Sequence, residues 1–333
     1  MTFTRSLRED LARRDFTINA MAWDPITQAL EDPFGGLKDL ERGLVRAVGV
    51  PLERFREDGL RSMRAIRFAA TLSFKIEPET WEGLKGALDI FQGVAMERIQ
   101  VELFKTLLSA EAGWGLEALK QSQMLTHIAP ELDALDAQLF TQTAEALARI
   151  APRISPRLAA LFFGLSGAEE RAQRRLRALK CSKQLTQSVT QLLRWSEVRP
   201  ETERTDAQVR ALAAQVGQAQ LPELVDMRRA LAESSQAPEE SRAWLALLER
   251  VEEIKAYEAP QSPRDLALRG SELSQRLGIP PSKVIGELLN ALLHHVWEQP
   301  QDNTVERLLK VAPRIARELG VRLDPSQSEG RGR

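Results

Sequence analysis

The stretches that decide the fold are Arg13-Arg14-Asp15-Phe16-Thr17-Ile18-Asn19-Ala20-Met21-Ala22 and, further along, Glu57-Asp58-Gly59-Leu60-Arg61. After two guanidiniums and a carboxylate, the first stretch alternates apolar and polar residues. This predicts a strand whose inner face is formed by Phe16, Ile18, Ala20 and Ala22. In the second stretch, Asp58 and Arg61 stand three residues apart on a predicted helix, so both side chains should project from one face. Together the two stretches predict a nucleotide site.

The Asp58 and Arg61 pair has the chemistry to read a nucleobase. A carboxylate only accepts hydrogen bonds and a guanidinium only donates them. Cytosine and adenine each present an amino donor beside a ring-nitrogen acceptor, which matches the pair, whereas guanine and uracil present the reverse order. The pair would therefore select C and A without a template. The alternative is that Glu57 and Asp58 are acids favoured in the first turn of a helix, but the nearby Arg13-Arg14-Asp15 string favours base reading.

Composition and periodicity predict a soluble, cytoplasmic protein of the α+β class that is mostly α. The 333 residues carry a net charge of −1 and 43% apolar content, enough for two or more compact units. Residues 1–48 show strand patterns, and nearly everything from Leu52 onward has helical periodicity, in stretches between 56 and 256. The segment 259–263 is expected to be a linker. The single cysteine, Cys181, and the three histidines argue against a Cys/His zinc site, and no apolar run reaches the length of a membrane span.

A resemblance covers nearly the whole chain. The strings LREDLARRDFTINAMA, DPFGGLKDL and RAVGVPLERFREDGLRSMRAIRFAATLSFKIEPET resemble the bacterial-type tRNA nucleotidyltransferases (CCA-adding enzymes) and the related poly(A) polymerases. Residues 96–110 are similar to the neck helix of that family, and residues 270–312 to its C-terminal segment. Long polar strings in a fixed order do not arise from amphipathic patterning alone.

The resemblance implies transfer of CMP and AMP from CTP and ATP onto the 3′ end of tRNA, with Mg²⁺ as cofactor. It assigns contacts with the ribose and phosphates to Arg14, Asp15 and Asn19, and base reading to Asp58 and Arg61. Glu57 would hold Arg61 or a neighbour in place. Further positive charge near the triphosphate would come from Arg13, Arg64 and Arg67.

The resemblance also implies a division of the chain. Residues 1–48 would be a partial nucleotidyltransferase head and 49–130 a neck with the nucleotide-selecting helices. Residues 131–258 would be a helical body, 259–324 a C-terminal tail that binds tRNA, and 325–333 a disordered end.

One half of the family's active site is not found in this sequence. In the family, a Gly-Gly turn and an Asp-x-Asp pair come before the Arg-Arg-Asp string and supply the triphosphate cradle and the metal carboxylates. Here no two aspartates stand two residues apart, and Gly35-Gly36 belongs to the DPFGG turn. We therefore expect no catalytic carboxylates and no Mg²⁺ ligands in this chain, and no transfer by it alone.

Three further interpretations stay open. The chain could be a poly(A) polymerase, a non-catalytic RNA-binding remnant, or one subunit of a split enzyme. A truncated head would also leave the Phe16 strand with an unpaired edge and an uncovered apolar face from Phe16, Ile18 and Met21, through which the chain could associate.

A basic stretch is the candidate RNA contact. Residues 151–194 contain nine Lys/Arg and two acids, Glu169 and Glu170. The alternative is a solvated helix face, and the sequence does not decide between the two. The RNA-binding candidates are Arg171, Arg174, Arg175, Arg177, Lys180 and Lys183.

Overall fold

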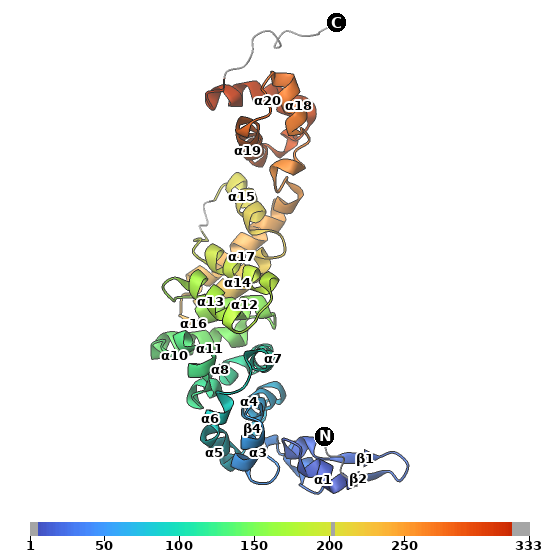
Figure 1. Cartoon of the computed structure of the whole chain (residues 1–333). Coiled ribbons are helices and arrows are strands. Elements are labelled where there is room, and N and C mark those ends of the chain that lie inside the picture. Colours follow the sequence, from blue (N-terminus) through green and yellow to red (C-terminus); the bar gives the residue numbers. More distant parts are fainter. Residues whose placement is uncertain (1–5, 201–203, 322–333) are drawn as a thin grey trace. The chain divides into compact units, whose positions relative to one another are not determined.

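The structure is a computed structural model that describes residues 6–200 and 204–321 (Figure 1). The chain divides by its internal contacts into two compact units. Unit 1 comprises Met1–Glu197 with Asp226–Pro238, and unit 2 comprises Val198–Val225 with Glu239–Arg333. The predicted body, 131–258, therefore has residues in both units, and the expected disordered end, 325–333, lies outside the described residues.

The N-terminal part of unit 1 combines short helices with short strands. Its helical elements are α1 (Leu7–Ala12), the 3-10 turn η1 (Thr17–Asn19) and α2 (Gly36–Glu41). Strands β1 (Ala22–Asp24) and β2 (Ala29–Glu31) form an antiparallel hairpin, while β3 (Leu44–Val45) pairs in parallel with β4 (Lys75–Ile76). A small core in this part of the chain contains Leu11, Ala20 and Val48.

The continuous strand predicted from Phe16 to Ala22 is wrong, because polar side chains hold its first residues in another conformation and only Ala22 belongs to a strand, β1. The carboxylate of Asp15 accepts a hydrogen bond from the amide of Phe16 at 3.0 Å. The hydroxyl of Thr17 donates to the buried carboxylate of Asp39 at 2.6 Å, and residues Thr17–Asn19 turn into η1. The bond from the Asp15 side chain to the backbone competes with regular strand pairing. Between Phe16 and Met21, extended pairing is limited to a bridge between Phe16 and Ala47.

The uncovered apolar face expected on this segment is also wrong. Phe16 is fully buried, and its ring meets that of Phe68 edge to face at a centroid distance of 5.5 Å. Ile18 and Met21 are half-buried. The expected association through this edge therefore loses its basis. Exposed apolar side chains lie instead on the β1–β2 hairpin, where Trp23 is 60% and Ile26 is 91% exposed.

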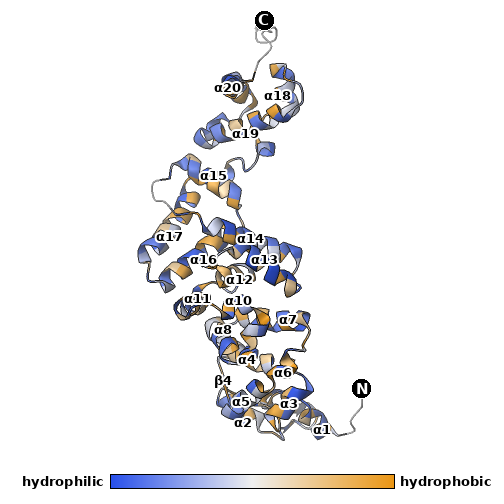
Figure 2. Cartoon of the chain, turned by 60° about the vertical axis from the view of Figure 1, so that its left-hand side comes forward, coloured by the Kyte–Doolittle hydropathy of each residue, from blue (hydrophilic) through white to orange (hydrophobic). Residues whose placement is uncertain are grey.

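The rest of unit 1 is helical, which confirms the mostly α class predicted from periodicity (Figure 2). Helix α4 packs against α7 through buried side chains such as Met63, Ile66 and Ile99. The helices of unit 1 are α3 (Pro51–Glu57), α4 (Leu60–Leu72), α5 (Pro78–Gly86), α6 (Leu88–Phe91), α7 (Met96–Leu107), α8 (Ala112–Gln121), α9 (Met124–Ile128), α10 (Pro130–Asp133), α11 (Ala137–Arg149), α12 (Ile154–Phe162), α13 (Ala168–Ala178), α14 (Lys183–Ser196) and the end of α16 (Leu221–Ser234).

Gly59, between α3 and α4, is required by a close backbone approach. A Cβ at this position would lie 2.8 Å from the carbonyl oxygen of Ile90, a distance that no side chain can adopt without moving the backbone. The approach fixes the step between the two helices. It thereby sets where the neighbouring Asp58 lies.

Unit 2 has its own core around α19. The Pro-rich segment 259–263, expected to separate a last unit, lies within it: Ala259 belongs to this core, and the indole of Trp297 donates to the carbonyl oxygen of Pro260 at 2.9 Å. No helix in the described part of the chain is long and apolar enough to cross a membrane. The elements are α15 (Asp206–Val216), α17 (Pro238–Glu253), η2 (Ala256–Glu258), η3 (Pro263–Asp265), α18 (Gly270–Leu277), α19 (Lys283–Glu298), η4 (Pro300–Asp302) and α20 (Val305–Glu318).

Hydrogen exchange should separate the β1–β2 hairpin from the segment around Phe16. Within the described residues the hairpin pairs with no further strand, and a two-stranded sheet is marginally stable in water. The amide of Thr17, in contrast, donates to the backbone carbonyl oxygen of Arg46 at 2.9 Å, beside buried side chains. We expect amides 22–31 to exchange much faster than those of Thr17 and of α7. Equal protection of the hairpin and α7 would contradict this expectation.

Candidate functional site

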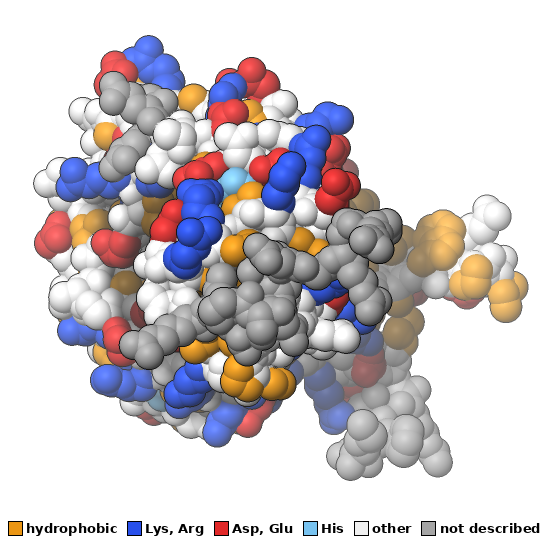
Figure 3. All heavy atoms as spheres, turned by 90° about the horizontal axis from the view of Figure 1, so that it is seen from above, with side chains coloured by type: hydrophobic (Ala, Val, Ile, Leu, Met, Phe, Trp, Pro, Cys, Tyr) orange, Lys and Arg blue, Asp and Glu red, His pale blue; other side chains and the backbone are white. Residues whose placement is uncertain are grey.

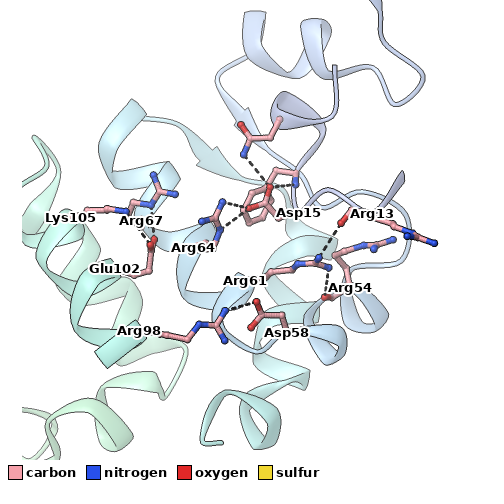
Figure 4. A network of polar contacts seen from close by, with 12 residues as sticks. Arg13, Asp15, Arg54, Asp58, Arg61, Arg64, Arg67, Arg98, Glu102 and Lys105 are labelled. Carbon is pink, nitrogen blue, oxygen red and sulfur yellow. Dashed lines mark hydrogen bonds and ion pairs between the residues drawn. The ribbon is translucent and has the colours of Figure 1, made fainter. Parts of the chain in front are cut away.

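A cavity of about 540 Å³ in unit 1 gathers most of the residues singled out from the sequence. It brings together segments from α1's end, the α3–α4 junction, α4 and α7 (Figure 4). Seven of the predicted nucleotide-binding residues line it, and Arg67 does not. The lining residues are Arg13, Arg14, Asp15, Asn19, Asp58, Leu60, Arg61, Arg64, Phe68 and Arg98.

At one side of the cavity, Asp15 orients Asn19 and Arg64. Its Oδ1 accepts from the Asn19 side-chain amide at 3.1 Å, and its Oδ2 accepts from Arg64 Nε at 2.8 Å and Nη2 at 2.6 Å. Asp15 is almost buried, at 9% exposure, so these bonds satisfy a desolvated carboxylate. The remaining donors of the Arg64 guanidinium, which is one-third exposed, are available for an anionic ligand.

Asp58 lies at the junction of α3 and α4 and not on a helix, which corrects the geometry predicted from the i, i+3 spacing. Its backbone is extended, with φ −153° and ψ 106°. Its Oδ1 accepts from the amide of Leu60 at 3.1 Å, and its carbonyl accepts from the amide of Arg61 at 3.0 Å. Asp58 therefore caps the start of α4, as aspartate often does. Asp58 and Arg61 nevertheless line the same cavity.

Arg61 is held by a network that includes the predicted contact with Glu57. Its Nη1 donates to Glu57 Oε2 at 2.7 Å and to the carbonyl of Arg54 at 3.2 Å. Its Nη2 donates to the carbonyl of Arg13 at 3.0 Å, which joins α4 to the end of α1. Because a guanidinium has five N–H donors, these three bonds leave Arg61 with donors for a ligand.

Arg98 is a cavity residue that the sequence did not single out. It comes from the first turn of α7, and its Nη2 donates to Asp58 Oδ2 at 2.7 Å. The stretch 96–110 resembles a neck helix, but helical periodicity does not show which side chain reaches a residue 40 positions away.

Arg67 lies outside the cavity lining. Its Nε donates to the nearly buried Glu102 at 2.8 Å, and its guanidinium stacks 3.5 Å from the centroid of the Phe68 ring. Phe68 does line the cavity. Arg67 thus acts on the cavity wall through Phe68.

The charge of the cavity suits an anionic ligand. Five of the lining side chains are arginines and two are aspartates, whereas the face of the molecule seen in Figure 3 mixes acidic and basic side chains. Burial raises the pKa of Asp58, but the hydrogen bonds from Arg98 and the Leu60 amide and the charges of Arg98 and Arg61 outweigh it, so the pKa falls below its usual value. Asp58 is therefore an ionised acceptor at neutral pH.

The described residues do not fit a Mg²⁺ site. Among residues 6–200 and 204–321, no group of three or more His, Cys, Asp or Glu side chains is arranged to hold a metal ion. Of the cavity aspartates, Asp15 is bound by Arg64 and Asp58 by Arg98.

The basic stretch 151–194 is less available than its composition indicated. Arg157, one of the nine basic residues of this stretch, is 3% exposed and donates to backbone carbonyls, among them those of Ser109 at 2.8 Å and Ile150 at 2.6 Å. Arg175 forms two hydrogen bonds of 2.7 Å with Glu131. The exposed members of the candidate set are Arg171, Arg174, Arg177, Lys180 and Lys183.

Three family models match successive parts of the chain. The poly A polymerase head domain matches residues 1–46, the RNA and SrmB-binding site of polymerase A matches 73–136, and tRNA nucleotidyltransferase domain 2 matches 155–312. The last two cover the helical region that begins after the cavity-forming helix α4.

Several CCA-adding enzymes are similar to this chain in sequence or structure. The CCA-adding enzyme of Enterococcus faecalis is 34% identical over 312 residues, which is 94% of this chain and 72% of that protein. The Bacillus stearothermophilus CCA-adding enzyme in complex with CTP superposes with a TM-score of 0.76 at 25% identity, covering 96% of this chain and 77% of that one. The Thermotoga maritima CCA-adding enzyme complexed with tRNA shares the fold, with a TM-score of 0.62 at 22% identity over 93% of this chain and 74% of that one.

Proposed function

Since this chain belongs to the family of bacterial CCA-adding enzymes, which are tRNA nucleotidyltransferases, we propose that the cavity of unit 1 binds CTP and ATP. The nucleotide would then be the donor of CMP or AMP to the 3′ end of tRNA, without a template. The main support is that a hydrogen-bond acceptor, Asp58, and a donor, Arg61, line one cavity and are each held in place by hydrogen bonds.

Base selection is the role proposed for Asp58 and Arg61. An exocyclic amino group of cytosine or adenine would donate to Asp58, and the adjacent ring nitrogen would accept from Arg61. Uracil and guanine would place a carbonyl against the carboxylate and an N–H against the guanidinium. Because both protein groups are already oriented, little conformational entropy is lost on binding.

The ribose and phosphates would occupy the side of the cavity formed by the remaining residues. Arg13, Arg14 and Arg64 supply positive charge, and guanidiniums match phosphate geometry. Asn19, oriented by Asp15, offers an amide for a ribose hydroxyl. Glu57 supports the site through Arg61, and Arg67 supports it through Phe68.

The proposal also covers the metal cofactor, the tRNA contact and the cellular compartment. Mg²⁺ is expected from the family's chemistry, with ligands other than the described residues. The proposed tRNA contact consists of the exposed cations on α13, in the turn after it and at the start of α14: Arg171, Arg174, Arg177, Lys180 and Lys183. The head, neck, body and tail divisions drawn from the sequence are proposed as functional regions. The cytoplasm is proposed as the compartment, since one cysteine suits a reducing environment.

Equilibrium binding of the four nucleoside triphosphates tests the proposal. We expect the chain to bind CTP and ATP about tenfold or more tightly than UTP and GTP, because mismatched donors and acceptors are left unpaired. The variant Arg56→Met should show the same preference as the unmodified chain, since Arg56 is exposed on α3 and does not line the cavity. Equal affinity for all four nucleotides would contradict base selection. Affinity for ATP alone would favour the related poly(A) polymerase activity instead.

The polypeptide of residues 1–333 is predicted not to transfer nucleotides by itself. Its sequence contains no Asp-x-Asp pair, and metal-assisted transfer needs closely spaced carboxylates. Incubation with Mg²⁺, labelled CTP and tRNA lacking its 3′ end should give no incorporation above a metal-free control. Incorporation by rigorously purified chain would show that other carboxylates hold the metal. Binding without transfer would also be expected of a non-catalytic remnant or of one subunit of a split enzyme.

A further inference from the structure

Arg98 reaches Asp58 from a different part of the fold. Arg98 belongs to α7, whereas Asp58 lies between α3 and α4, and their side chains meet at the cavity (Figure 4). Nη2 of Arg98 donates to Oδ2 of Asp58 at 2.7 Å, with 52% of the Arg98 side chain and 32% of the Asp58 side chain exposed. The pair is thus open to the cavity and not a buried structural bridge.

The Asp58 carboxylate is held at both oxygens. The amide of Leu60 binds Oδ1 at 3.1 Å, and Arg98 binds Oδ2. Rotation of the carboxylate would break one of these bonds, so its plane is fixed. A carboxylate has about four lone-pair sites, so each oxygen keeps capacity to accept a further hydrogen bond from a ligand in the cavity.

We propose that Arg98 is a positioning residue for base selection: it fixes the Asp58 carboxylate in the orientation that accepts the amino group of cytosine or adenine. This inference rests on the proposed function of the cavity. It assigns to α7 a part in nucleotide choice, in addition to its packing against α4.

Arg98 also determines what the carboxylate can recognise. A protonated Asp58 would carry an O–H donor, which can bind the carbonyl oxygen of uracil or guanine and so admit the wrong bases. The hydrogen bond from Arg98 opposes the effect of burial and lowers the pKa of Asp58. The charged groups around the same cavity are Arg13, Arg14, Asp15, Arg61, Arg64 and Arg98, with Glu57 bound to Arg61.

The test compares CTP and UTP binding by the full chain and its Arg98→Met variant. The preference for CTP should fall about tenfold, the value of a hydrogen bond to a charged group. Arg98→Lys should restore part of it, because an ammonium can still donate to Oδ2. Lys105→Met is the matched control: Lys105 lies on the same helix, is 53% exposed and pairs with Glu102, outside the cavity.

The pH profile gives a readout that loss of packing alone would not move. The folded pKa of Asp58 is depressed, so the preference is present at neutral pH and is lost as pH falls through that pKa. Without Arg98 the pKa rises, and the loss should begin at a higher pH. An unchanged pH profile in Arg98→Met would overturn the proposed role.

Two outcomes separate this inference from the function on which it rests. If the unmodified chain shows no preference between CTP and UTP, the proposed function fails. If it prefers CTP and Arg98→Met prefers CTP equally, only the role of Arg98 fails. The double variant Asp58→Ala with Arg98→Met should show the same preference as Asp58→Ala alone. A further loss in the double variant would mean that Arg98 acts independently of Asp58 and would also overturn the inference.

Discussion

Asp58→Ala is expected to lower the preference for CTP and ATP over UTP and GTP by about tenfold to a hundredfold. The substitution removes the acceptor for the exocyclic amino group, and an unpaired polar group in a site built for hydrogen bonding costs about 1–3 kcal/mol. Arg98 also loses its partner at 2.7 Å. Competition binding with the four nucleotides measures the effect directly.

The Asp58→Ala result needs a control for helix capping. Asp58 also accepts from the Leu60 amide at the start of α4, and loss of a cap costs about 1 kcal/mol of stability. Asp58→Ser keeps a capping oxygen but not the carboxylate. It should recover the stability and leave the preference weakened. Recovery of both by serine would assign Asp58 to helix structure.

Arg157→Met is expected to destabilise unit 1 by roughly 3 kcal/mol, because it leaves several buried carbonyls without a donor. Arg157 donates to Leu107 at the end of α7, to Ser109, and to Ile150 at the end of α11. Helix C-terminal carbonyls carry partial negative charge, which offsets the desolvation of the guanidinium. Burial lowers the pKa of Arg157, and the charge of Asp226 opposes that change.

Urea unfolding followed by circular dichroism measures the effect of Arg157→Met. Arg174→Met is the comparison, because Arg174 lies in the same basic stretch and is exposed. It should change the free energy of unfolding by no more than about 0.5 kcal/mol. Equal losses in the two variants would mean that the carbonyl contacts of Arg157 contribute nothing to stability.

The helices were predictable because their signal is local. Apolar residues at three- and four-residue spacing predicted helices over nearly all of the chain from Leu52 onward, and most of the described residues in that range are helical. The strand predicted at Phe16 does not form, although the residues alternate, because side-chain hydrogen bonds from one distant and one adjacent residue hold this segment in another conformation. Asp39, 22 residues away, binds Thr17, and the Asp15 side chain binds the amide of Phe16. The alternation of apolar and polar residues gives no information about such hydrogen bonds.

The cavity residues were predictable from their motifs, but not their geometry. Asp58 and Arg61 line one cavity, yet Asp58 is an extended cap and not a helical residue. The contact with Arg98 depends on how α7 crosses the α3–α4 junction, a tertiary feature without a sequence period. The burial of Arg157 was not predictable either, because counting charges treats every arginine as a surface residue, whereas Arg157 is buried.

Hydrogen exchange of the chain with saturating CTP, and separately with UTP at the same concentration, tests the central claim most directly. If the cavity binds a nucleotide and selects its base, CTP should protect peptides that cover 13–19, 57–64 and 96–101, and UTP should protect them much less. Absence of protection in these three segments, or equal protection by the two nucleotides, would contradict the account.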